Sequence, residues 1–335
     1  MNLASLPVTL RQLQYAVAVA DARSFRRAAE ACHVAQPSLS AQIAELESAL
    51  GVRLFERDRR RVLLTPAGEA LVERARRVLL DVDDMLQAAR GHSDPLAGTL
   101  RIGVIPTVGP YLLPEIDPAL RAAFSRLQLV WVEDKTESLV QQVARGELDA
   151  ALLALEADLG ELEHAAVGRD HFLLAAAGDH PLAHARGAVR LRDLRGQHVL
   201  LLEEGHCLRD QTLELCSTAG ADELGFRATS LSTLSQMAAA GSAVTLLPEI
   251  ALDLENRRGV FTIRPFEDPA PYRTIVLAWR RRSSLHDALQ ALAAAARDAF
   301  EVAREQRAKA TAMPRRPPRK QARQRARPAS GRRPR

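Results

Sequence analysis

The chain has 335 residues, 47% of them hydrophobic and 26% charged, a balance typical of a globular protein with two or three domains. No apolar stretch approaches the ~20 residues needed to cross a bilayer, and the first residues lack a secretory signal pattern, so we expect no membrane association and a cytoplasmic location. In that reducing compartment the three cysteines are expected to be thiols. Residues 306–335 carry twelve Lys or Arg and no acid, so the formal net charge of +5 masks about −7 in the rest of the chain.

The first 51 residues predict three short helices. Thr9 can cap a helix over residues 9–20, and FRRAAEA after Ser24 reads as a second helix. A third begins at Pro37, where proline is tolerated in the first turn, and ends at Gly51. A short helix, a tight turn and an amphipathic helix together indicate a helix-turn-helix DNA-binding motif.

The exposed face of the third predicted helix carries groups that can contact base edges and phosphates in a major groove, although an ordinary polar helix face is the alternative. These candidate residues are Gln36, Pro37, Ser38, Ser40 and Gln42. Residues 52–64 form two apolar runs around a charged tip, which favours a hairpin wing against the phosphate backbone. Its candidate contacts are Arg57, Arg59, Arg60 and Arg61. Double-stranded promoter DNA is therefore the expected partner of a winged helix-turn-helix domain over residues 1–66.

A long helix follows, opened by Thr65 and Pro66. Its apolar side chains recur in alternating steps of four and three, at Leu71, Ala75, Val78, Val82, Met85 and Ala89. This spacing predicts a coiled-coil seam, and hence a homodimer joined through a linker helix over residues 67–97. Packing of the same helix on its own chain is the alternative.

The segment FRRAAEACHVAQPSLSAQIAELESALGVRLFERDRRRVLLTPAGEAL resembles the LysR-type transcriptional regulators. The resemblance implies a homotetramer that binds DNA and has RNA polymerase as a further partner. One departure is Ala35, where the family usually has a serine that can cap the recognition helix. Losing such a cap typically costs about 1 kcal/mol.

From Thr99 the chain alternates short apolar runs with helical segments, which predicts an α/β body with a mainly parallel sheet. The expected strands are TLRIGVI, LQLVWVE, DAALLAL, HFLLAAA, HVLLLEE, AVTLLP and TIVLAWR. Standard nucleotide-binding and hydrolytic motifs do not occur. The family resemblance implies a sensor of two similar α/β lobes over residues 98–304, like a periplasmic binding protein, with an effector site in the cleft. Residues 305–335 are expected to be a disordered basic tail, either solubilising or binding phosphates.

The segment LLEEGHCLRDQTLELC places Cys207 where a strand turns into a helix. Helix amides there favour a thiolate, and the neighbouring His206 and Arg209 would help, so this thiol is expected to react at neutral pH. Cys216 lies nine residues on, a rise of about 13 Å in an intact helix. Because a disulfide needs Cα atoms within about 7 Å, the two cysteines can join only if the helix unwinds. Two small buried hydrophobic residues are the ordinary alternative.

The segments GVIPTVGPYLLP, GHCLRDQ, FRATSLSTL and AAAGSAVTLLP are similar to the hydrogen-peroxide-sensing members of the LysR family. The resemblance implies that Cys207 is the peroxidatic cysteine, which forms a sulfenic acid, and that Cys216 is the resolving cysteine. It also implies a peroxide pocket made by Thr107, Thr136, His206 and Arg273, with Asp210 as an outer partner. Disulfide formation would then refold the sensor and change DNA binding, activating oxidative-stress genes.

Two other functions share features with this interpretation. A LysR-type regulator that answers to a small carboxylate inducer would have the same fold and need no paired cysteines, and a thiol peroxidase would use an activated cysteine without a DNA-binding head. Zinc held by Cys207, Cys216 and His206 is excluded by spacing, because no close pair supplies the remaining ligands. We therefore expect a regulator rather than an enzyme, with neither metal nor cofactor. Cys32 is expected to be a buried structural thiol.

Overall fold

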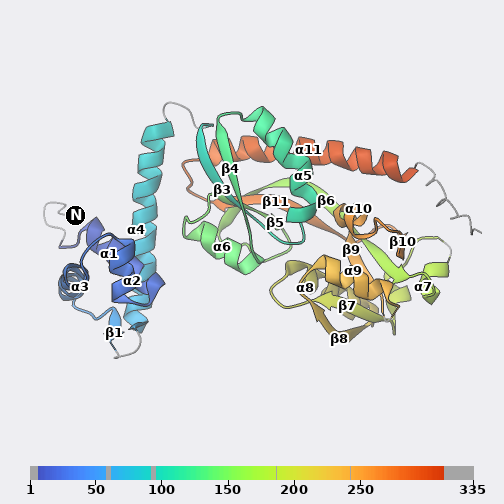
Figure 1. Cartoon of the computed structure of the whole chain (residues 1–335), viewed down its shortest axis with the longest axis horizontal. Coiled ribbons are helices and arrows are strands. Elements are labelled where there is room, and N and C mark those ends of the chain that lie inside the picture. The colour runs from blue at the N-terminus through green and yellow to red at the C-terminus, as the bar shows by residue number, and fades with distance from the viewer. Residues whose placement is uncertain (1–6, 58–61, 92–95, 186, 242, 313–335) are drawn as a thin grey trace, which may run out of the picture.

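The computed structural model describes residues 7–57, 62–91, 96–185, 187–241 and 243–312. A small N-terminal head and one long helix stand beside a larger α/β body (Figure 1). Within the described residues, no helix is both long and apolar enough to span a membrane.

The head contains three helices and a two-stranded antiparallel wing: α1 Leu10–Ala22, α2 Phe25–Ala31, α3 Gln36–Leu50, β1 Phe55–Arg57 and β2 Val62–Leu64. Local capping sets the helix ends as predicted. Thr9 forms a capping box with Gln12 at the start of α1, and Gly51 ends α3 in a left-handed conformation with φ of 70°. Ala35, at the start of α3, makes no side-chain capping bond, which confirms the expected departure. The buried faces of the three helices meet in one apolar core.

Helix α4, Pro66–Gly91, divides into two parts by its packing. Val72 and Ala75 are buried near α1, so the first part of the predicted seam is partly used within the chain. Further along, Val78 and Met85 are 43% and 62% exposed. The second part of α4 therefore offers apolar side chains to a partner, while the side chain of Ala89 lies outside the described residues.

The first lobe of the body is built on strands β3 Gly98–Val104, β4 Leu127–Glu133 and β5 Ala150–Ala154, with helices α5 Gly109–Ala123 and α6 Thr136–Ala144. Strand β3 lies between β4 and β5 and is parallel to both. Strand β11, Tyr272–Arg280, runs antiparallel to β5 and to the long strand β6, Leu162–Ala177. Helix α11, His286–Ala312, contacts α5, β6 and β11.

Strand β6 continues into the second lobe, where it pairs antiparallel with β9, Thr245–Pro248, and β10, Phe261–Pro265. The remaining elements of this lobe are α7 Pro181–His184, β7 His198–Leu202, α8 Cys207–Ala219, β8 Asp222–Ala228, α9 Leu231–Ala239 and α10 Leu252–Glu255. Strands β7 and β8 form a separate parallel pair. Figure 1 shows the second lobe beside the first, with β6 reaching into both.

Two expectations from the sequence need correction. The main sheet is mixed rather than mainly parallel, because β11 runs antiparallel to its neighbours β5 and β6, and β9 and β10 run antiparallel to β6. Helix α11 extends to Ala312 and so occupies the beginning of the segment expected to be a disordered tail. Residues 313–335 lie outside the described residues.

Candidate functional site

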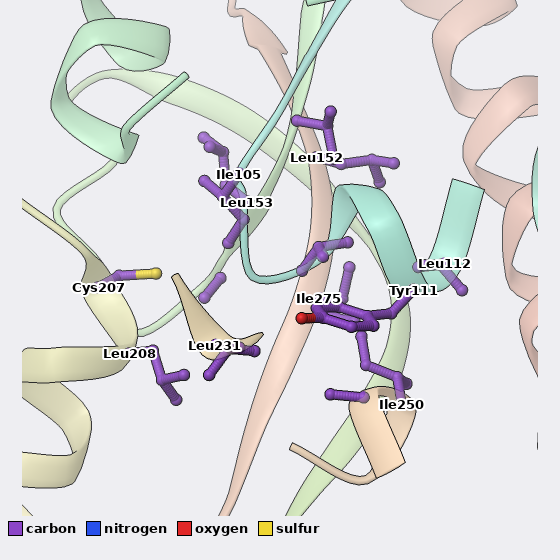
Figure 2. Packing of buried hydrophobic residues seen from close by; sticks show 14 of the residues in the cluster. Ile105, Tyr111, Leu112, Leu152, Leu153, Cys207, Leu208, Leu231, Ile250 and Ile275 are labelled. Atoms are coloured by element: carbon purple, nitrogen blue, oxygen red, sulfur yellow. The ribbon is translucent and has the colours of Figure 1, made fainter. Parts of the chain in front are cut away.

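Cys207 is the first residue of α8, directly after a tight turn that leaves strand β7. Gly205 makes this turn possible because its φ is 89°, a conformation that other residues rarely adopt. The Cys207 side chain is 7% exposed and belongs to the main apolar cluster. Its sulfur points away from α8 and into that cluster (Figure 2). The predicted position at a strand-to-helix turn is confirmed.

The environment of Cys207 raises the pKa of its thiol above the ordinary value. Burial is the largest cause, because a thiolate loses its hydration inside the protein. The positive charge of Arg273, the Thr136 hydroxyl and the Leu208 amide each act in the opposite direction. The expectation that the helix start makes this thiol acidic is therefore wrong for this conformation, since desolvation outweighs the amides.

Arg273 on β11 is completely buried and held by two partners. Its Nε donates to Asp170 Oδ2 at 2.9 Å, while Nη1 and Nη2 donate to the Thr107 side-chain and backbone oxygens at 2.8 Å each. Asp170 is 1% exposed and lies directly across from Arg273 in the pairing of β6 with β11. The guanidinium is thus fixed by the sheet, and its charge lowers the pKa of Cys207.

A pocket of about 600 Å³ opens over Cys207, between α6 and the start of α8. Thr136, the first residue of α6, and Asp210, in the first turn of α8, both line it. Thr136 is 8% exposed, and its hydroxyl acts on the neighbouring Cys207 thiol but makes no well-formed hydrogen bond to the described part of the chain. Asp210 is exposed and raises the pKa of Cys207, though less than burial does. The structure therefore brings Thr136, Asp210 and Cys207 to one pocket.

His206 caps α8 by position and is 5% exposed. Burial, followed by the charge of Lys135, lowers the pKa of its imidazole, so His206 is neutral at pH 7. Its buried Nε2 has no hydrogen-bond partner among the described residues. The residue lines a second pocket, of about 410 Å³. Arg209 forms a bidentate ion pair with Glu223 at 2.9 and 3.2 Å. The cation that favours the Cys207 thiolate is therefore Arg273, rather than His206 or Arg209.

Cys216 lies on the same continuous helix and is 3% exposed. Burial alone raises the pKa of its thiol to about 11. Nine residues of intact α8 separate the two cysteines by about 13 Å along the helix axis. Both are free thiols, as is Cys32, which is half-buried where complete burial was expected.

Two polar contacts near the site could not be recognised from the residues around them in the sequence. One is the pairing of Asp170 with Arg273, which lies 103 residues away. The other is a buried cluster in which Tyr111 Oη and Ser232 Oγ both donate to Glu255 Oε1 at 2.7 Å. Burial raises the pKa of Tyr111 far above its usual range, so the phenol keeps its proton and joins the first lobe to the second.

The candidate DNA-contacting residues differ in exposure where the chain is described. Gln36, Pro37 and Ser38 are exposed at the start of α3, whereas Ser40 and Gln42 are half-buried. Gln42 Nε2 donates to Glu45 at 2.8 Å. Arg57 is the last residue of β1, and its side chain lies outside the described residues, as do Arg59, Arg60 and Arg61.

Comparisons with known proteins match both parts of the chain. Residues 10–69 match the family described as bacterial regulatory helix-turn-helix protein, lysR family, and residues 93–301 match the LysR substrate binding domain. A hydrogen peroxide-inducible genes activator from Dickeya chrysanthemi is 45% identical over 296 residues, which cover 88% of this chain and 97% of that protein.

Solved structures give the same picture. A cysteine variant of full-length OxyR from Pseudomonas aeruginosa has a TM-score of 0.71 at 36% identity, covering 88% of this chain and 96% of that one. A peroxide-bound cysteine mutant of Corynebacterium glutamicum OxyR has a TM-score of 0.63 at 33% identity, covering 92% and 97% of the two chains. These similarities favour neither the carboxylate-inducer alternative nor the thiol peroxidase.

Proposed function

Because the chain belongs to the LysR family of bacterial regulators, and within it to the OxyR group of hydrogen peroxide-inducible activators, we propose that it is a transcription regulator switched by oxidation of Cys207. Hydrogen peroxide is the signal, and a disulfide between Cys207 and Cys216 is the switched state. The observation that carries this proposal is the position of Cys207. Its thiol is buried, the residue lines a pocket, and the thiol is influenced by the Thr136 hydroxyl and by the charge of the fixed Arg273 guanidinium.

Arg273 and Thr136 have separate tasks in the first step. The Cys207 sulfur attacks one peroxide oxygen, the O–O bond breaks, and the thiol proton leaves with the departing hydroxide as water, giving a sulfenic acid. Arg273 favours the thiolate and the negative charge that develops on the oxygens. Thr136 lines the pocket, and its hydroxyl beside Cys207 can position the peroxide. Thr107 and Asp170 hold the guanidinium in place.

The second step requires α8 to unwind. The Cys216 sulfur must displace the sulfenic hydroxyl as water, but the intact helix separates the two sulfurs by far more than a disulfide allows. Contacts between the lobes near the start of α8 would be lost in that change. Lys135 Nζ donates to Glu203 at 2.5 Å, and Gln211 Nε2 donates to Glu156 at 3.2 Å. Oxidation is thereby coupled to a rearrangement of the sensor.

The head is proposed to read double-stranded promoter DNA through α3, with the wing on the phosphates. The exposed Val78 and Met85 support α4 as the dimer contact, and the family supports a homotetramer that works with RNA polymerase. We place the protein in the cytosol, where its DNA target lies, and propose that it acts as a regulator rather than an enzyme.

The test is peptide mass mapping of the reduced protein after brief exposure to near-stoichiometric hydrogen peroxide, with free thiols alkylated before digestion. A cross-link between Cys207 and Cys216 is expected, and it should be absent from Cys207→Ser. Cys32→Ser should still form it. If Cys207 is alkylated as fully after exposure as before, the proposal fails.

A further inference from the structure

The pocket over Cys207 has an unusual charge. Its wall is formed by α6, by the segment between β5 and β6, and by the start of α8. The acidic residues in this wall are Glu137, Glu156, Asp158 and Asp210. All four acidic side chains are exposed to solvent. Among the described residues that line the pocket there is no lysine, arginine or histidine.

Two cations close to this site are each paired with a carboxylate. Lys135 runs past Gly205, and its ammonium group is bonded to Glu203. Arg273, whose charge acts on the Cys207 thiol, is paired with Asp170. Neither cation lines the pocket, so acidic side chains are the charged groups that an approaching molecule meets at its wall.

The floor of the pocket is nevertheless suited to a small polar molecule. Thr136 is more than nine-tenths buried and lines the pocket, and its hydroxyl makes no well-formed hydrogen bond in the described chain beyond its influence on the neighbouring Cys207 thiol. A buried hydroxyl in this state gains from a bound molecule that hydrogen-bonds to it. The floor therefore favours a hydrogen-bonding ligand, whereas the wall disfavours an anionic one.

We propose that these carboxylates make the pocket charge-selective, so that uncharged peroxide reaches Cys207 while anionic peroxides and anionic thiols are held back. This inference rests on the proposed function of Cys207. It has a consequence for the second step. A thiol from solution can condense with the Cys207 sulfenic acid to give a mixed disulfide and water, in competition with Cys216. Because the common cellular thiols are anionic, the acidic wall slows their entry. The Cys207 sulfenic acid then condenses with the Cys216 thiol instead.

The test compares two peroxides that perform the same reaction and differ in charge. Hydrogen peroxide is neutral and leaves hydroxide, whereas peroxymonosulfate is an anion and leaves sulfate; each transfers one oxygen to the thiolate and gives the same sulfenic acid. The rate of Cys207 oxidation is measured with both in the wild type and in Glu137→Gln/Asp158→Asn. The matched control is Glu267→Gln/Asp298→Asn, which removes two exposed charges outside the pocket.

In Glu137→Gln/Asp158→Asn, oxidation of Cys207 by peroxymonosulfate should be about threefold faster than in the wild type at low ionic strength. High salt should reduce this difference between the two proteins. The rate with hydrogen peroxide should be unchanged, and the control variant should behave as the wild type with both. Three results would overturn the inference and leave the proposed function intact. These are an equal gain in the oxidation rate with both peroxides, no gain with peroxymonosulfate, or the same gain in the control variant. If neither peroxide oxidises Cys207 in any variant, the proposed function fails, and this inference with it.

Discussion

The two ends of α8 hold chemically equal thiols in very different surroundings. Cys207 at the start of the helix faces a pocket and has Arg273, Thr136 and a backbone amide acting against the effect of burial on its pKa. At Cys216, near the end of the helix, burial alone sets the raised pKa. Burial by itself protects a thiol; burial with a fixed cation and an open pocket prepares one for reaction. The difference assigns the first oxidation to Cys207.

Removing the charge of Arg273 should have the largest effect on the difference in reactivity between Cys207 and Cys216. Arg273→Met is expected to slow sulfenic acid formation at Cys207 by about 100-fold, as losing one fixed charge-stabilising donor does in enzymes. The substitution leaves Asp170 buried without its partner, which is destabilising. Arg273→Met/Asp170→Asn removes both charges and controls for folding. Stopped-flow measurement of Cys207 oxidation provides the readout. A wild-type rate in the double variant would show that the Arg273 charge does not make Cys207 more reactive than Cys216.

Alkaline pH should reveal how burial of Cys216, near the end of α8, affects the stability of the fold. The pKa of Cys216 is raised from an ordinary value of 9.0 to about 11 in the folded protein, so between these pH values the folded state keeps a proton that the unfolded state has lost. Its contribution to stability is complete below pH 9 and is lost as pH rises towards 11. From pH 8 to pH 10.5 the wild type should lose about 2 kcal/mol more free energy of unfolding than Cys216→Ala. Urea denaturation at both pH values tests this, and equal losses would contradict it.

Thr136 should matter less than Arg273 because it contributes one neutral hydrogen bond. Thr136→Val keeps the shape of the side chain and removes the hydroxyl. The rate of Cys207 oxidation by hydrogen peroxide should fall about fivefold, which corresponds to a net hydrogen bond of about 1 kcal/mol. Alkylation of Cys216 in the unfolded protein should be unaffected. A larger loss than in Arg273→Met would reverse the order of the two groups.

The smallest effect is expected from the contact between Gln211 and Glu156, which joins α8 to the first lobe. Gln211→Met has a similar helix propensity and removes the donor. Disulfide formation after the sulfenic acid should become about twofold faster, because an exposed hydrogen bond worth about 0.5 kcal/mol no longer opposes unwinding. Formation of the sulfenic acid should keep its rate. Quenched samples analysed by mass spectrometry separate the two steps, and a change in the first step alone would contradict this role.

Features set by neighbouring residues could be predicted from the sequence. Thr9 and Gly51 delimit helices of the head through local capping, and the glycine turn after β7 places Cys207 at a helix start. Strands β8 and β10 escaped prediction. β8 is largely exposed and pairs only with β7, so its sequence, DELGFRA, lacks an apolar run.

Features set by distant residues could not be predicted. The pairing of Arg273 with Asp170 depends on the register of two strands far apart in the chain. The sign of the Cys207 pKa shift depends on how deeply the thiol is buried, which no local pattern reveals. The link from Tyr111 to Glu255 likewise exists only after the two lobes meet.

The cross-strand position of Arg273 gives the switch a way to reset. The ladder between β6 and β11, and not α8, holds the guanidinium and its carboxylate partner. Because these contacts do not involve α8, we expect this anchor to keep its place in the sheet when α8 unwinds in the proposed switch. Once the disulfide is reduced, Cys207 returns to a site in which Arg273 and Asp170 are still paired. The protein can then react again without re-forming the ion pair that influences this thiol.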